Sequence, residues 1–169
     1  MTLRDLHVVE LSDLLDAEQQ MLRELPLMAS RATSGELRAL FDDHYRDTQR
    51  HIRRLEAVFT ALDERPRASS GDGMRGIIVE ARERHAVWDP GTVLDTALAG
   101  LARRLKHYEI AAYECAVSHA AAIGHPDAAA LLRETLDEER GTDSQLSELF
   151  RRCLLQPLNR VDASVPLVV

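Results

Sequence analysis

Apolar residues recur at intervals of three and four along four long stretches of the chain, a period that is typical of amphipathic α-helices. The pattern predicts long helices at about 3–31, 33–62, 89–124 and 125–155, and a shorter amphipathic helix from about Met74 to Trp88. Five predicted helices and no strand pattern indicate an all-α protein.

Start and stop signals bound these stretches. Thr33 and Glu36 have the spacing of a capping box at the start of the second long helix. Asp89-Pro90 and His125-Pro126 place a first-turn proline at the start of the third and the fourth. Pro157 closes the last helix, so we expect a helical domain over 1–156 and a tail without helical period over 157–169.

The connections between the helices predict the topology. Short links join the first helix to the second and the third to the fourth, so each pair forms an antiparallel hairpin. The segment from Glu64 to Pro90 is long enough to run the length of the bundle. We therefore expect a four-helix bundle with one long crossover that carries the short helix, which is the connectivity of ferritin-like bundles.

Composition narrows the class of protein further. The 169 residues carry a formal net charge of −7, and 45% of them are hydrophobic, which fits a single globular domain. Scattered arginines predict no nucleic-acid footprint, and no apolar window is long enough to cross a membrane. The start of the chain has no secretory pattern. We interpret Cys115 and Cys153 as reduced, buried residues of a cytoplasmic protein.

Ionisable residues interrupt the apolar stripe of every long helix. They are Glu18 in the first, His44, Asp47 and His51 in the second, Glu109 in the third, and Glu139 and Asp143 in the fourth. Glu18 lies 91 positions before Glu109, whereas Asp47 and His51 lie 92 positions before Glu139 and Asp143. The chain thus resembles a doubled hairpin with one residue of slippage.

Unpaired carboxylates in a core are costly and repel one another. No lysine or arginine occupies a stripe position beside these groups in this interpretation, so bound cations explain them economically. The alternative for each residue is an arginine partner from a polar face or a place at a solvated helix edge. Carboxylate and imidazole ligands on four facing helices suit two divalent ions, iron first, with manganese or zinc as alternatives.

Four segments also carry a family resemblance: LLDAEQQMLRELPLMA, DHYRDTQRHIRRLEAVFTAL, LKHYEIAAYE and AAALLRETLDEERGTDSQL. They resemble the YciE/YciF family of bacterial stress-associated ferritin-like proteins, in the same order and over nearly the whole chain. The resemblance implies a ferritin-like fold, a homodimer and a dinuclear metal centre. The metal ligands that it implies are Glu18, Asp47, His51, Glu109, Glu139 and Asp143.

The pattern departs from the usual di-iron motif in two ways. The ligand pairs are spaced i,i+4 instead of Glu-x-x-His, and Asp143 stands in place of the second histidine. His44 is a further candidate ligand or a partner of a ligand. Glu138 is a weaker substitute for Glu139, because it points about 100° away on the helix.

The sequence is compatible with three functions. The first is a metal-binding protein of the stress response whose dinuclear centre reacts with oxygen or peroxide. The second is a structural or interaction protein that catalyses nothing and holds a metal, or none, in its core. A storage cage is the third and is disfavoured, because no short helix follows the fourth long one. Apolar Ile77, Ile78 and Trp88 on the short helix are candidates for a dimer surface.

Overall fold

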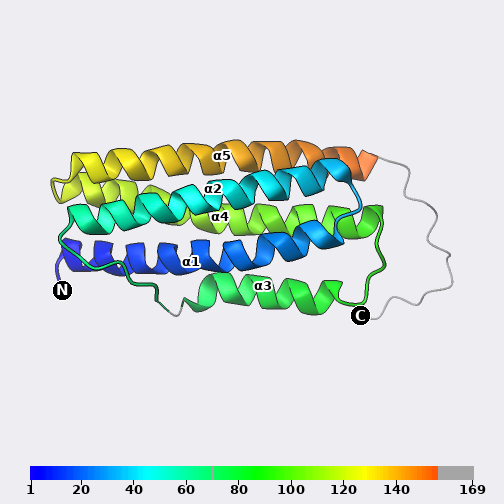
Figure 1. Cartoon of the computed structure of the whole chain (residues 1–169), viewed down its shortest axis with the longest axis horizontal. Helices are drawn as coiled ribbons and strands as arrows, with labels where there is room; N and C mark the ends of the chain where they lie inside the picture. Colours follow the sequence, from blue (N-terminus) through cyan, green and yellow to red (C-terminus); the bar gives the residue numbers. More distant parts are fainter. Residues whose placement is uncertain (70, 156–169) are drawn as a thin grey trace.

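The described part of the protein, residues 1–69 and 71–155 of a computed structural model, contains five helices and no strand (Figure 1). The helices are α1 (Leu3–Arg31), α2 (Gly35–Ala61), α3 (Asp72–His85), α4 (Thr92–Ala122) and α5 (Pro126–Leu155). The predicted all-α class is confirmed. The predicted tail at 157–169 lies outside the described residues.

The four long helices form one bundle with a single long crossover. α1 and α2 form one antiparallel hairpin and α4 and α5 the other, while α1 also packs on α4 and α2 on α5 (Figure 1). α3 lies in the crossover and packs against α1 and α4. At about 1.5 Å per residue, the 29 residues of α1 span about 44 Å. The predicted connectivity is therefore confirmed.

The core of the bundle is divided into two apolar clusters. One contains Met21, Phe41 and Leu105, and the other contains Leu15, Leu55 and Leu136. Along each long helix the change from one cluster to the other occurs where polar residues are buried. The fold thus places a polar layer near the middle of its long axis.

Helix starts differ from the sequence interpretation in two places. α2 is capped by Ser34, which accepts a hydrogen bond from the Leu37 backbone N–H, because Thr33 is engaged with Asp95 instead. α4 begins at Thr92, after Gly91, and not at Asp89-Pro90. The predicted Thr33–Glu36 capping box is therefore wrong, and the boundary of α4 was placed a few residues early.

The short helix turns much of its apolar face inward. Ile78 is buried and Ile77 packs against the core cluster next to it, so these side chains support the contact of α3 with the bundle. Trp88 is exposed, as are its neighbours Val87 and Val93. Of the candidate dimer residues, Trp88 alone is exposed, and it lies beyond the end of α3 at His85, so the predicted end of the short helix at Trp88 was placed too late.

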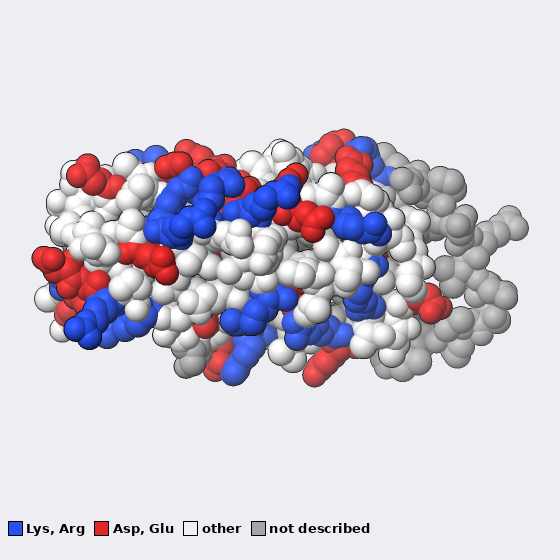
Figure 2. Space-filling view, viewed as in Figure 1, with Lys and Arg blue, Asp and Glu red and all other residues white. Residues whose placement is uncertain are grey.

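The two cysteines differ in their exposure, and the surface carries charges of both signs. Both cysteines are free, but Cys115 is exposed and only Cys153 is buried, which corrects the interpretation of Cys115 as a core residue. Positive and negative side chains alternate over the face shown in Figure 2. Within the described residues, no helix combines the length and apolarity that a membrane span needs.

Candidate metal centre

The polar layer contains side chains from all four long helices, each of them almost completely buried. They are Glu18 from α1, His44, Thr48 and His51 from α2, Lys106, Glu109 and Tyr113 from α4, and Thr135, Glu139 and Thr142 from α5. Every long helix thus sends at least one ionisable group inward, as the sequence predicted.

Regular helical spacing brings these side chains to one level. Residues 44, 48 and 51 share one face of α2, and residues 135, 139 and 142 share one face of α5. Each member of the first set lies 91 positions before its counterpart in the second, and Glu18 lies 91 positions before Glu109. The doubled hairpin therefore has a uniform offset, without the predicted slippage.

Glu18, His51 and Glu139 form the first group of facing ligand atoms. Their candidate ligand atoms all lie within 4.8 Å of one another. His51 Nδ1 is 3.2 Å from Glu18 Oε1 and 3.0 Å from Glu139 Oε1. Three different helices thus direct one imidazole nitrogen and two carboxylates at a common point.

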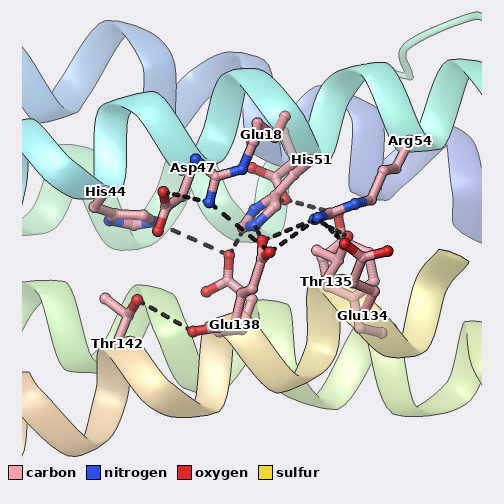
Figure 3. A network of polar contacts seen from close by, with 12 residues as sticks. Glu18, His44, Asp47, His51, Arg54, Glu134, Thr135, Glu138 and Thr142 are labelled. Atoms are coloured by element: carbon pink, nitrogen blue, oxygen red, sulfur yellow. Dashed lines mark hydrogen bonds and ion pairs between the residues drawn. The ribbon is translucent and has the colours of Figure 1, made fainter.

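The other nitrogen of the His51 ring contacts Glu138. His51 Nε2 lies 2.9 Å from Glu138 Oε2, and Arg54 donates two hydrogen bonds to the same carboxylate (Figure 3). A proton on Nε2, donated to Glu138, leaves the Nδ1 lone pair toward Glu18 and Glu139. Such carboxylate partners orient the histidine ligands of many metal sites. Glu138 therefore positions a candidate ligand without facing the group itself.

His44, Glu109 and Glu139 form a second group of the same kind. His44 Nε2 lies 4.0 Å from Glu139 Oε1, and all three side chains are buried. Glu139 belongs to both groups, so it is the carboxylate that two neighbouring cation positions would share.

A buried lysine lies beside the second group. Lys106 Nζ is 2.7 Å from Glu109 Oε2 and donates a hydrogen bond to Glu139 Oε2. Its side chain has no exposed surface. The expectation that no lysine or arginine occupies the stripe is therefore wrong. The signal was in the sequence, since Lys106 follows Ala102 by four positions and precedes Glu109 by three.

The pKa shifts in the layer follow from burial and from these contacts. Burial alone would lower the pKa of His51, but Glu18 and Glu139 raise it to about 10. Burial raises the pKa of Glu109, whereas Lys106 and His51 overcome the effect of burial on Glu139 and keep its pKa low. Burial and Lys106 lower the pKa of His44, which stays neutral. In the absence of metal, Lys106 and His51 thus compensate the negative charge.

Several buried ligand atoms lack a hydrogen-bond partner among the described residues. Glu18 Oε1 accepts a hydrogen bond of 2.7 Å from the Tyr113 hydroxyl, while Glu18 Oε2 has no hydrogen-bond partner among the described residues. The same holds there for His51 Nδ1 and Glu139 Oε1. Because buried polar atoms normally find a partner, these three atoms fit a cation at the first group.

The other predicted ligands lie at the rim of the layer. Asp47 is partly exposed and pairs with Arg50 at 2.8 Å. Asp143 pairs with Arg103 at 3.1 Å and lies 3.5 Å from the exposed His107. The structure therefore brings together four of the six predicted ligands, Glu18, His51, Glu109 and Glu139. His44, the further candidate from the sequence, lies with them, and Lys106 and Tyr113 are added by the structure.

The sequence matches a known family over most of its length. The model of the family described as domain of unknown function DUF892 matches residues 2–159. The chain belongs to the DUF892 family. Protein YciF of Escherichia coli K12, a relative of this DUF892 member, is 37% identical over 150 residues, which cover 88% of this chain and 90% of that protein. The predicted YciF-like family is confirmed.

Two solved structures share the fold of this chain over most of its length. The structure of the E. coli stress protein YciF matches with a TM-score of 0.88 and 32% identity, over 92% of this chain and 99% of that one. YcfI from Rhodopseudomonas palustris matches with a TM-score of 0.85 and 35% identity, over 87% and 94%.

A more distant likeness supplies the name of the fold. An Anabaena variabilis protein with DJ-1/ThiJ/PfpI-like and ferritin-like domains matches with a TM-score of 0.69 and 20% identity. The match covers 98% of this chain and 42% of that protein. The predicted ferritin-like fold is thereby confirmed.

Proposed function

We propose that this DUF892 member binds a divalent transition metal ion in the polar layer, through Glu18, His51 and Glu139. The observation that carries the proposal is the setting of His51. One ring nitrogen lies between carboxylates from two other helices, and the opposite nitrogen is held by Glu138. This is the carboxylate–imidazole–metal arrangement of ligating histidines.

The ligand set suggests which metals the site would take. Two carboxylates and one imidazole suit iron or manganese, and zinc less selectively. A metal ion held by three protein ligands keeps positions for a small molecule and supplies Lewis-acid or electron-transfer chemistry there. The apolar clusters on both sides of the layer would limit the access of water.

The small molecule, the cellular role and the oligomeric state are also part of the proposal. We propose that oxygen or peroxide is the small molecule, that the protein acts in the cytoplasm during stress, and that it forms a homodimer. The description of the E. coli relative as a stress protein supports the physiological part. Exposed Trp88, Val87 and Val93 offer apolar surface for a second copy.

A second candidate function is a structural or interaction role without metal. Lys106 favours it, because a buried ammonium between Glu109 and Glu139 makes the polar layer tolerable without any ion. A measurement of the metal content of the protein would distinguish the two candidate functions.

The test uses untagged protein, from which metal is first removed and to which Fe²⁺ (anaerobically), Mn²⁺ or Zn²⁺ is then added. We expect bound metal after gel filtration and a higher melting temperature, since an ion that binds the folded state stabilises it by about 2.7 kcal/mol at 100 times its Kd. Glu18→Gln should lose both effects, and Asp143→Asn should keep them. A melting temperature that none of the three ions changes, together with no retained metal, would refute metal binding and leave the structural role.

Peroxide tests the reactive part of the proposal. Protein loaded with Fe²⁺ should oxidise its iron faster on addition of peroxide than the same amount of Fe²⁺ mixed with the Glu18→Gln variant. Equal rates would remove the oxidant from the proposal and leave metal binding untouched.

A further inference from the structure

Two neighbouring groups of ligand atoms share Glu139, which is the geometry of a site for two cations. The first group is completed by Glu18 and His51, and the second by His44 and Glu109. Lys106 contacts both carboxylates of the second group and neither ligand that is specific to the first. The ammonium group therefore lies where a second ion would find its carboxylate ligands.

The choice of residue at this position is unusual for the chain. Lys106 is the only lysine in the sequence, and the other 20 basic residues are arginines. A guanidinium is a broad planar fork, whereas an ammonium is a compact point charge with three donors. A compact charge is what can occupy a position between two buried carboxylates that otherwise suits a metal ion.

A second divalent ion and the ammonium would exclude each other. Both would have to contact the carboxylates of Glu109 and Glu139, and like charges held so close together inside a protein repel strongly. The lysine has no exposed surface, so displacing its ammonium group would cost both carboxylate contacts and would require the buried side chains around it to rearrange.

From this geometry we infer that Lys106 takes the place of the second metal ion, so that the centre holds a single ion at Glu18, His51 and Glu139. The sequence predicted two ions. The inference rests on the proposed function for the first ion, but the role of Lys106 in the second position has its own test.

The experiment compares metal stoichiometry in the native protein and in Lys106→Met, at saturating Zn²⁺ or Mn²⁺. We expect one ion per chain in the native protein and two in the variant, because the methionine leaves Glu109 and Glu139 free to bind. Arg103→Met is the matched control: it removes one positive charge from the same helix at the rim, and should bind as the native protein does. Lys106→Gln, which keeps a donor for Glu109, is used in the same way if the methionine variant does not fold.

The difference between variant and native protein decides the inference, and the native value decides the proposed function. A native protein that binds no ion refutes the proposed function, while a variant that still gains one ion supports the role of Lys106. Two ions in the native protein, or no gain in either variant, would overturn the inference.

A measurement on the native protein gives an independent answer. Because the chain has one lysine, labelling lysine with ¹⁵N yields a single ammonium signal in an NMR spectrum. We expect this signal to remain protected from solvent exchange at saturating Zn²⁺. Loss of the signal to solvent exchange on metal addition would show that the ammonium is displaced, and would overturn the inference.

Discussion

At the scale of single residues, Glu139 lies close to three ionisable side chains of the layer. Oε2 accepts a hydrogen bond from Lys106, and Oε1 lies 3.0 Å from His51 Nδ1 and 4.0 Å from His44 Nε2. Each of the two candidate ligand groups depends on this carboxylate. Its neutralisation should therefore affect the whole layer, unlike that of a rim carboxylate.

We expect Glu139→Gln to abolish metal binding and Asp47→Asn to leave it unchanged. The amide removes the shared negative charge and leaves Lys106 and His51 with one anionic partner fewer. Asp47 contacts Arg50 at the rim, so the loss of its charge affects an exposed pair worth less than about 1 kcal/mol. Metal per chain and the far-ultraviolet circular dichroism spectrum are to be measured for both variants. Metal loss in Asp47→Asn would contradict the place of Asp47 outside the proposed metal site.

Tyr113→Phe tests the support of Glu18. The Tyr113 hydroxyl is buried and donates to Glu18 Oε1 at 2.7 Å. A hydrogen bond to a charged group contributes about 1.5–3 kcal/mol, so we expect the free energy of unfolding in metal-free buffer to fall by about that amount. Urea unfolding measures it. Tyr108→Phe, at a half-buried position of the same helix, is the control and should change stability by less than about 0.5 kcal/mol.

The sequence could identify Glu18, Glu109 and Glu139 as buried carboxylates, because each replaces an apolar residue within a long stripe. It could not decide between Asp47 and Thr48, since both stand three and four positions from His44 and His51. The same ambiguity holds for Asp143 and Thr142 between Glu139 and Leu146. Desolvation decides it, because the threonine is cheaper to bury and an arginine is available to each aspartate at the rim.

At the scale of helices, the two hairpins are joined near one end by Asp95. This buried carboxylate of α4 accepts hydrogen bonds from the backbone N–H groups of Thr33 and Ser34 and from the Thr33 hydroxyl. It thereby satisfies the turn between α1 and α2, whose N–H groups precede the first turn of α2. The contact holds the turn between α1 and α2 against the first turn of α4, and so ties one hairpin to the other.

Asp95→Ala should destabilise the protein by about 2–3 kcal/mol, because it removes the charged acceptor of two backbone donors in a partly buried turn. Thr33→Val removes only the hydroxyl donor and should cost about 1 kcal/mol. Chemical unfolding of the two variants provides the comparison. Equal effects in the two variants would mean that the backbone contacts of Asp95 contribute nothing.

Sequence periodicity located all five helices, because long amphipathic helices produce a strong signal. It misplaced the start of α2, since Thr33 and Ser34 are both good capping residues. Asp95, 62 positions away from Thr33, determines which of them caps. Long-range contacts of this kind have no local signature.

At the scale of the whole molecule, buried histidines make the stability of the bundle depend on pH at separate places. His51 lies in the polar layer, where carboxylates favour its charged form. His7 lies in the first turns of α1, where it is fully buried, and its ring centroid is 6.2 Å from that of His119. Neither nitrogen of His7 has a hydrogen-bond partner among the described residues, so nothing there stabilises its charge.

The pH dependence of stability tests the environment of His7. Burial, with a smaller contribution from His119 and His125, lowers its pKa to about 4 from 6.5 in the unfolded chain. The folded state thus favours the neutral ring, so the contribution of His7 is fully present above pH 6.5 and is lost as the pH falls from 6.5 toward 4. The shift corresponds to about 3 kcal/mol. We expect urea unfolding in metal-free buffer to show a smaller loss over this range in His7→Leu than in the native protein. His107→Leu, which changes an exposed histidine, should follow the native curve. Parallel curves for His7→Leu and the native protein would show that His7 charges at the same pH in both states, contrary to its burial.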